Sequence, residues 1–457
     1  MQAALTHKSA FKGVKMKIAL SDHFDYKRLL LFTLPSILMM IFTSIYGVVD
    51  GLFVSWRAGK TAFSALNFIM PYLMILGASG FMIGSGGSAL IARKLGEGDA
   101  RGARRTFSFL VYFTLVLGTV TAVLGILLLP TAARLLGASD EMLPYCVEYG
   151  WIVLLGLPFF MLQMEFQTFF SVAEKPMAGL VVTLASGFTN IILDALLVGV
   201  FDLKLVGAAA ATAISQLVGG ALPLIYFSFK NSSLLSLGRC NIDLKALLHT
   251  CTNGSSELLS NISMSLVGMV YNAVLMRYAG EDGVSAYGVM MYVTMIFIAV
   301  FIGFSMGTAP IVGFNFGAGN RSELQNVRKK SFRIIGVTSV LMLGFALAMA
   351  YPLASVFVGY DKALYELTAS GFMIYSVHFL FCGIGIFGSS FFTALNNGLI
   401  SAVISFFRTV VFQVVFVLLL SFLFGIVGVW LSIVAAEFLS MLLSVFFLVK
   451  YKKRYGY

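Results

Sequence analysis

The segment GSALIARKLGEGD, residues 87–99, closes a long apolar run, and a similar segment, GTAPIVGFNFGAGN, occupies residues 307–320. Two more pairs repeat in the same order. FFSVAEKP from Phe169 resembles FFTALNNG from Phe391, and VVDGLFVSWRAG from Val48 resembles MVYNAVLMRYAG from Met269. The three pairs are separated by 220, 222 and 221 positions. Chance similarity among apolar helices does not easily give three matches in one register, so the sequence predicts a duplicated unit.

The composition indicates that both units lie in a membrane. Hydrophobic residues make up 59% of the 457 positions, charged residues only 11%, and the mean hydropathy is +0.94. Soluble domains usually carry about 25% charged residues. The net charge of +11 comes from Lys and Arg in short gaps between apolar runs, a pattern that does not indicate nucleic-acid binding. The four cysteines lack disulfide or zinc spacing.

The apolar runs predict the number and direction of the membrane passes. A bilayer core needs about 20 apolar residues per helix. Twelve such runs fit the sequence, at 27–56, 62–92, 106–129, 144–171, 176–199, 205–228, 250–276, 284–314, 331–350, 365–393, 398–424 and 426–449. With the N-terminus inside, 24 of the 31 Lys and Arg residues fall in cytoplasmic segments and 6 fall in outer loops. The positive-inside rule therefore predicts that both termini are cytoplasmic.

These observations together predict an all-α integral membrane protein with twelve transmembrane helices in two six-helix lobes. Because six passes return the chain to its starting side, the two copies run parallel and are related by a pseudo-two-fold axis along the membrane normal. The expected parts are a cytoplasmic N-terminal tail (1–26), an N-terminal lobe (27–228), a cytoplasmic linker (229–249), a C-terminal lobe (250–449) and a cytoplasmic C-terminal tail (450–457). The tail lacks the apolar core and cleavage site of a signal peptide.

A polar cluster is expected in the outer half of the first lobe. Asp50, Asp194 and Thr212 lie about five to seven residues from the outer ends of their helices, which at about 1.5 Å per residue places them near one plane. Asn190 is one turn from Asp194 on the same face. Intramembrane carboxylates are costly and are usually functional. These four oxygen-bearing side chains predict a cation-coupling site for a small cation or a shared proton.

The alternative for this cluster is polar glue, in which Asn190 and Asp194 only hydrogen-bond neighbouring helices. Two aspartates at matched depth favour the coupling site, because they repel each other unless a cation or a proton joins them. A shift of 221 carries the four positions to Tyr271, Val411, Val415 and Ile433. The second lobe is therefore expected to lack the cluster, as a single coupling site would.

Other polar residues in the helices are less specific. Glu257 is either a second protonatable site or a carboxylate reached by cytoplasmic water. Arg408 and Glu437 come at similar depth and are expected to form a structural ion pair, and His378 to be a hydrogen-bonded interior histidine. Glu165 and Gln167 approach the inner end of their helix and are expected to face water. Pro35 removes a backbone hydrogen bond and makes the first helix bendable.

The chain resembles the multidrug and toxic-compound extrusion (MATE) family from about residue 27 to 449. Pro35 with VVDGLFV, GSALIARKLGEGD, NIILDALLV (190–198) and GAAAATAISQ (207–216) carry the resemblance. Members of that family are twelve-helix antiporters that exchange cationic or amphipathic drugs for sodium ions or protons around a central cavity. The resemblance assigns Asp50, Asn190, Asp194 and Thr212 to the cation site, Tyr46 to its hydrogen-bond network and Pro35 to a helix bend. It leaves Glu257 as a substrate or network residue, and the tenth helix offers His378 where some members have an aspartate.

The resulting hypothesis is a multi-pass transporter of the cell membrane that exports lipophilic cations. It is expected to be monomeric, to need no cofactor beyond its coupling ion, H⁺ or Na⁺, and to bind no nucleic acid. The alternative is a lipid-linked-precursor flippase of the same superfamily, which predicts more helices or a strongly cationic cavity. An enzyme is not expected, because the sequence lacks a recognisable nucleophile, metal cluster or acidic prenyl-phosphate motif.

Overall fold

The computed structural model describes residues 18–57 and 60–457, and part of the cytoplasmic tail expected at 1–26 lies outside the described residues. The helices follow one another along the chain as α1 (Tyr26–Arg57), α2 (Lys60–Gly96), α3 (Ala100–Leu136), α4 (Leu143–Val172), α5 (Pro176–Leu193), the π-helix η1 (Asp194–Val200), α6 (Lys204–Ser228), α7 (Leu244–Gly317), α8 (Arg321–Val358), α9 (Lys362–Tyr375), the 3₁₀ helix η2 (Ser376–His378), α10 (Phe379–Ala394), α11 (Gly398–Phe406), the π-helix η3 (Phe407–Val411) and α12 (Phe412–Tyr455).

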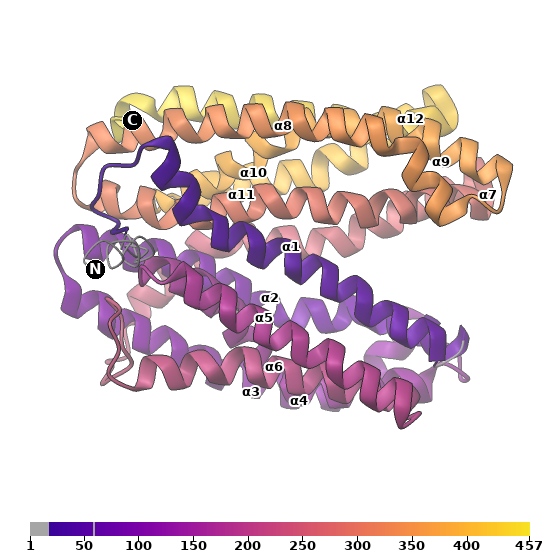
Figure 1. Cartoon of the computed structure of the whole chain (residues 1–457), viewed down its shortest axis with the longest axis horizontal. Helices are drawn as coiled ribbons and strands as arrows, with labels where there is room; N and C mark the ends of the chain where they lie inside the picture. The colour runs from indigo at the N-terminus through magenta and orange to yellow at the C-terminus, as the bar shows by residue number, and fades with distance from the viewer. Residues whose placement is uncertain (1–17, 58–59) are drawn as a thin grey trace, which may run out of the picture.

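Ten helical segments of the described chain are long and apolar enough to cross a membrane, and two of them contain a reversal. Gly280 in α7 has φ 60° and ψ −148°, and Gly425 in α12 has φ 60° and ψ −135°. These left-handed glycines break α7 and the α11–η3–α12 segment into two passes each. Twelve transmembrane helices result, arranged as two six-helix lobes: α1–α6 form the N-terminal lobe and α7–α12 the C-terminal lobe (Figure 1).

The repeated motifs form the same local structure in each lobe. In GSALIARKLGEGD, Gly98 has φ 83° and Asp99 caps α3 by accepting from the Gly102 amide at 2.8 Å. In GTAPIVGFNFGAGN, Gly319 has φ 67° and Asn320 caps α8 by accepting from the Glu323 amide at 3.1 Å. A left-handed glycine followed by an Asp or Asn cap ends one helix and starts the next. The duplication therefore preserves the turn as well as the sequence.

The two lobes meet along a seam of glycines. A β-carbon on Gly86 of α2 would overlap the Thr250 carbonyl oxygen and lie 2.7 Å from the Gly254 nitrogen of α7. In the second crossing, a β-carbon on Gly307 would lie 3.0 Å from the Thr33 Cα of α1. Gly86 and Gly307 are 221 positions apart, as are Thr33 and Gly254, so the two crossings are symmetry-related. Small residues let the backbones approach this closely.

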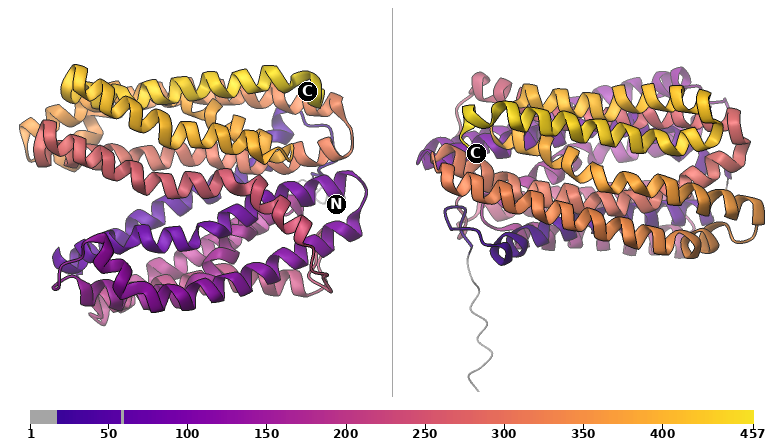
Figure 2. Two further views of the ribbon diagram at one scale, coloured as in Figure 1. Left: turned by 180° about the vertical axis from the view of Figure 1, so that it is seen from behind. Right: turned by 90° about the horizontal axis from the view of Figure 1, so that it is seen from above.

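The seam lies toward the end of the molecule where α1 starts and α12 finishes, which we call the terminal end. The ribbons of the two lobes converge there and diverge toward the opposite end (Figures 1 and 2). The segment before α1 crosses this end and is bonded to both lobes. The Leu20 amide donates to Glu174 Oε1 at 2.8 Å, and the Phe24 amide donates to Glu323 Oε1 at 2.9 Å.

Candidate functional site

Asn190 and Asp194 lie where α5 changes into the π-helix η1. Asn190 is 2% exposed in the last turn of α5, and Asp194, the first residue of η1, is fully buried. π-Helical turns inside α-helices are rare and occur often at functional sites, because they change the direction of the side chains that follow. The amide and the carboxylate therefore share a buried face at a point where the helix geometry changes.

Helix α1 reaches this face through Gly187. A β-carbon on Gly187 would overlap the Phe42 ring and lie 3.2 Å from Tyr46 Cδ1, so the missing side chain lets α1 pack closely on α5. Tyr46 is thus next to the helix turn that carries Asn190. Asp50 follows Tyr46 by one turn of α1, which also contacts η1, but the Asp50 side chain lies outside the part of the chain that the structure describes.

Helix α6 completes the face from the other side. A β-carbon on Gly207 would lie 3.0 Å from the Leu197 carbonyl carbon of η1, so α6 approaches η1 closely. The Thr212 hydroxyl is buried and has no hydrogen-bond partner among the described residues. The Asn190 Oδ1 atom is also buried and has no hydrogen-bond partner within residues 18–57 and 60–457. Buried polar atoms of this kind usually bind a partner. The structure therefore brings α1, α5, η1 and α6 together around the expected coupling residues.

Sequence reasoning missed a polar network beside this face. Gln163 Nε2 of α4 donates to Ser186 Oγ of α5 at 3.3 Å, and Ser186 Oγ donates to the Ser215 carbonyl of α6 at 2.7 Å. Ser215 Oγ in turn donates to the Thr212 carbonyl at 2.8 Å. Ser186 precedes Asn190 by four residues, so a polar stripe at helical spacing was the available signal. The network joins α4, α5 and α6 directly to the Thr212 backbone.

Pro35 lies where α1 touches both lobes. Its neighbour Ser36 has its hydroxyl 3.3 Å from Ser171 Oγ at the end of α4. Ile37 lies on the C-terminal lobe, because a β-carbon on Gly303 would be 2.9 Å from the Ile37 nitrogen. Thr33 packs on Gly307 in the second seam crossing. The bendable point of α1 is therefore part of the contact between the lobes.

The expectation that Glu165 and Gln167 face water is wrong. Glu165 is fully buried and Gln167 is 5% exposed. The reason is close packing of α2 on α4, since a β-carbon on Gly84 would lie 2.9 Å from Glu165 Cα. A glycine-rich partner helix covers the face that the sequence position suggested was open.

The C-terminal lobe contains a polar cluster of its own, although the shift of 221 predicts only apolar counterparts beyond Tyr271. The buried Tyr271 hydroxyl donates to Gln413 Oε1 at 2.7 Å and lies 2.9 Å from Ser432 Oγ. The Tyr287 ring stacks on Tyr271 with centroids 5.2 Å apart. Within the described part of the chain, the hydrogen-bond partners of the Tyr271 hydroxyl are an amide and a serine, whereas the N-terminal cluster contains the carboxylate of Asp194.

The π-helices explain why the uniform shift missed Gln413. Glu174 and Asn396, both left-handed with φ 57° and 58°, are 222 positions apart. Lys204 and Gly425, with φ 49° and 60°, are 221 positions apart. A π-helical turn adds one residue relative to a regular α-helix. Between these two pairs of positions, η3 (407–411) comes earlier in its helix than η1 (194–200) does in its own. Between η3 and η1 the shift between the lobes is therefore one residue larger, 223 instead of 222. We infer from this shift that Gln413 is the counterpart of Asn190.

Arg408, Glu437, His378 and Glu257 are ionisable residues within the membrane helices of this lobe. Arg408 Nε donates to Glu437 Oε2 at 2.9 Å, which confirms the expected ion pair. His378 is fully buried with Nδ1 2.6 Å from the Tyr375 carbonyl, which confirms the expected hydrogen-bonded histidine. Glu257 is half-buried in α7, and electrostatic interaction links it to Arg408.

A family model named MatE matches residues 35–196 and 258–419, one stretch in each lobe. The chain belongs to this family. The resemblance to the multidrug and toxic-compound extrusion transporters is thereby confirmed, and MATE proteins are ion-coupled transporters and not enzymes.

Curated relatives match this MATE protein over nearly its whole length. The chain is 28% identical over 437 residues to a multidrug export protein, MepA, of Staphylococcus haemolyticus, covering 94% of each chain. It is 28% identical over 423 residues to MepA of Staphylococcus aureus strain NCTC 8325, covering 91% of this chain and 92% of the relative.

Solved structures share the fold of this MATE protein. A crystal structure of MATE in complex with MaL6 superposes with a TM-score of 0.90 at 22% identity, covering 95% of this chain and 98% of the other. An outward-facing conformation of a multidrug resistance MATE family transporter gives 0.89 at 22% identity, covering 95% and 97%. The twelve-helix, two-lobe architecture expected from the sequence is thus confirmed.

Proposed function

We propose that this MATE protein is a secondary active antiporter that exports lipophilic cationic compounds across the cell membrane in exchange for protons or sodium ions. Both termini are cytoplasmic in this proposal, so the terminal end faces the cytoplasm and the structure is closed on that side. The full-length similarity to multidrug export proteins supports the substrate class. The observation that carries the proposal is the complete burial of Asp194 at the π-helical turn of a membrane-spanning helix.

The coupling site consists of Asp50, Asn190, Asp194 and Thr212. A charged carboxylate inside a membrane helix costs roughly 2.5 to 3.5 kcal/mol on insertion scales. A proton or a sodium ion removes that cost, so the charge state of Asp194 depends on cation binding. The Asn190 and Thr212 oxygens, which lack hydrogen-bond partners among the described residues, can coordinate a cation. The Tyr46 ring packs on α5 at Gly187, about one turn from Asn190.

Helix α1 transmits the effect of cation binding from the coupling site to the contact between the lobes. Neutralising Asp194 changes the interactions that hold α1 against η1, and the helix can bend at Pro35 because one backbone hydrogen bond is missing there. Thr33 and Ile37 flank that point and pack on the Gly307 and Gly303 backbone. A bend in α1 therefore alters the seam between the lobes, which is how cation binding biases the two access states.

The outer part of α7 supplies an adaptable surface for substrates. Beyond the turns that pack on α2, Met269 and Met276, seven residues apart on one face of α7, are 51% and 53% exposed. Methionine is flexible and polarisable and accommodates ligands of different shape. Glu257, further toward the terminal end of α7, is a candidate counter-charge for cationic substrates. This arrangement favours several unrelated lipophilic cations over one nutrient.

The decisive experiment compares Asp194→Asn with Asp202→Asn in proteoliposomes. Asp202 is exposed in the turn between η1 and α6, so its substitution removes the same charge outside the site. Asp194→Asn keeps size and hydrogen bonding, and it should still insert and bind drug while losing gradient-driven export. Asp202→Asn should export normally. Near-normal export by Asp194→Asn at equal expression would remove the coupling site from this position.

Transport measured across a pH gradient with sodium absent distinguishes proton coupling from sodium coupling. We expect proton coupling, because two carboxylates can share a proton without the five or six oxygen ligands that a sodium ion typically requires. Absence of transport under these conditions, with recovery on adding sodium, would assign the site to sodium.

The flippase alternative needs a cationic cavity to hold a lipid-linked phosphate. Among the described residues, Arg408 is the membrane-helix cation on which it would depend. Its side chain is 16% exposed, and its charge is compensated by Glu437 at 2.9 Å. The drug-export proposal therefore accounts better for the described residues. Transport of a fluorescent lipid-linked phosphate, with no dye export by the same preparation, would reverse this choice.

A further inference from the structure

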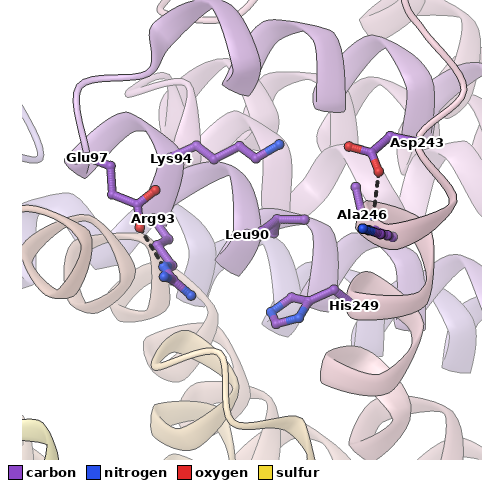
Figure 3. A pocket seen from close by; sticks show the side chains of 8 residues that line it. Leu90, Arg93, Lys94, Glu97, Asp243, Ala246 and His249 are labelled. Carbon is purple, nitrogen blue, oxygen red and sulfur yellow. Dashed lines mark hydrogen bonds and ion pairs between the residues drawn. The ribbon is translucent and has the colours of Figure 1, made fainter.

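A pocket of about 390 Å³ lies over the seam at the terminal end, between the last turns of α2 and the first turns of α7 (Figure 3). It is lined by Leu90, Arg93, Lys94, Glu97, Asp243, Lys245, Ala246 and His249. Its walls therefore come from both lobes. The coupling residues lie much further along the helices, so this pocket is separate from the proposed transport site.

The acidic residues of the pocket already have partners. Glu97 Oε1 accepts from Arg93 Nε at 2.8 Å, and Asp243 caps α7 by accepting from the Ala246 amide at 2.9 Å. Lys94 Nζ donates to Thr106 Oγ1 at 2.6 Å, which leaves two of its three donors for a ligand. Lys245 is exposed and makes no ion pair among the described residues. Lys94 and Lys245 thus line one pocket from opposite lobes, and neither makes an ion pair among the described residues.

An apolar surface adjoins this positive charge on α7. Leu244 and Leu248 are 69% and 67% exposed and lie one turn apart on one face, and Ile242 just before the helix is 80% exposed. Lys245 and His249 follow these leucines by one residue each, on the neighbouring face of the same two turns. A cationic pocket beside an exposed apolar strip matches a phospholipid, with a phosphate in the pocket and acyl chains along the leucines. A free phosphate would use only the pocket.

The floor of the pocket ties it to the closed seam. His249 Nε2 lies 3.2 Å from Asn396 Oδ1, and Asn396 Nδ2 donates to the Ala89 carbonyl at 3.2 Å. These bonds connect α7, the α10–α11 turn and α2 directly beneath the pocket. If the lobes separate at this end, Lys94 and Lys245 move apart. A ligand that contacts both lysines consequently binds the closed arrangement better than the open one.

We propose that this pocket binds the phosphate headgroup of an anionic phospholipid, which bridges the two lobes and stabilises the state closed at the terminal end. Basic pockets between transmembrane helices on the cytoplasmic side are suited to such headgroups. The lipid occupies a regulatory site and is not exported. This inference does not depend on which ion or drug the transporter uses.

The test uses full-length protein in nanodiscs and measures retained lipid by native mass spectrometry. Phosphatidylglycerol is compared with phosphatidylcholine, and Lys94→Gln/Lys245→Gln is compared with the wild type. Each lysine near an anionic membrane surface contributes about 1 kcal/mol, so the double variant should bind phosphatidylglycerol roughly 30-fold more weakly. The matched control is Lys452→Gln/Lys453→Gln, which removes two exposed lysines at the same end of α12 and should bind normally.

Three further results decide the proposal. Lys94→Arg/Lys245→Arg keeps both charges and should retain phosphatidylglycerol, which separates loss of charge from misfolding. Equal lipid retention by the glutamine variant and the α12 control would overturn the site. If the wild type retains inorganic phosphate at the lysines but retains no more phosphatidylglycerol than phosphatidylcholine, the pocket is a free-anion site and the lipid assignment is wrong.

The effect on conformation is read separately, by spin-label distances across the seam. Phosphatidylglycerol should shorten these distances in the wild type and leave them unchanged in Lys94→Gln/Lys245→Gln. Lipid binding to the wild type without any change in the distances would overturn the bridging role.

Discussion

Gly86→Ala should open the seam at the terminal end. The new β-carbon would overlap the Thr250 carbonyl oxygen and lie 2.7 Å from the Gly254 nitrogen, so it meets backbone on both sides and no side chain can rotate away. Overpacking of this kind costs typically 1–3 kcal/mol. The cost applies only when α2 and α7 are in contact, so it falls on the closed state alone. Since 1.4 kcal/mol is about a factor of ten, the closed-to-open ratio should fall by roughly 5- to 150-fold.

The assay is a distance measurement between spin labels at Arg101→Cys and Ser322→Cys, after the partly exposed Cys240 and Cys251 are replaced by serine. Positions 101 and 322 are both exposed, begin α3 and α8, and are 221 residues apart, so they report the separation of equivalent points in the two lobes. Gly86→Ala should add a population with longer distances.

Two further variants make the comparison specific. Gly254→Ala should act in the same direction, because its β-carbon would overlap the Met82 carbonyl oxygen of α2. Gly336→Ala on α8 is the matched control, since a β-carbon there meets no atom within 4 Å. The reasoning is refuted if Gly86→Ala and Gly336→Ala give the same distance distribution while Gly86→Ala remains folded.

Other outcomes test the remaining parts of the description. Arg408→Gln should lower the free energy of unfolding by about 3–5 kcal/mol because it leaves the Glu437 carboxylate buried and unpaired, and Arg408→Gln/Glu437→Gln should recover much of that loss. Melting temperatures measure the difference, and an equal loss in both variants contradicts the ion-pair account. Tyr271→Phe should cost only about 0.6–2 kcal/mol and preserve ion-driven transport, because its cluster serves packing; loss of coupling would make it part of a second site. Ala100→Cys should resist an impermeant maleimide added to intact cells, and efficient labelling there contradicts cytoplasmic termini. Expression in a drug-sensitive host should lower the accumulation of at least two chemically distinct cationic dyes, whereas movement of a single polar metabolite contradicts multidrug export.

Much of the candidate site was accessible from the sequence because membrane burial makes polar residues conspicuous. Asn190 and Asp194 stand out in an apolar helix, and the structure places both in a buried position next to α1 and α6. Gln163, Ser186 and Ser215 do not stand out in the sequence, because serine and glutamine are common in membrane helices and only their mutual contacts show that they form a network. The burial of Glu165 is likewise not predictable from its position in the sequence, since it depends on Gly84 of another helix.

The symmetry between the lobes is also only partly predictable from the sequence. Counting along the chain finds a constant shift where helices are regular, as at Gly98 and Gly319. It fails between Asn190 and Gln413, where η1 and η3 insert their extra residues at different points. A π-helical turn depends on local packing and leaves no clear pattern in the amino-acid order.

The sequence by itself determined that this chain is a duplicated twelve-helix membrane protein, because hydropathy, charge asymmetry and repeated turn motifs are properties of residues taken in order. It also located Asp194, since a carboxylate in an apolar run needs no partner to be noticed. Only the tertiary structure decided that Gly86 faces Gly254, that Lys94 and Lys245 share a pocket, and that Tyr271 bonds Gln413. Those facts depend on which faces of distant helices touch. That choice is made by the packing of all the helices together, and short-range patterns carry no record of it.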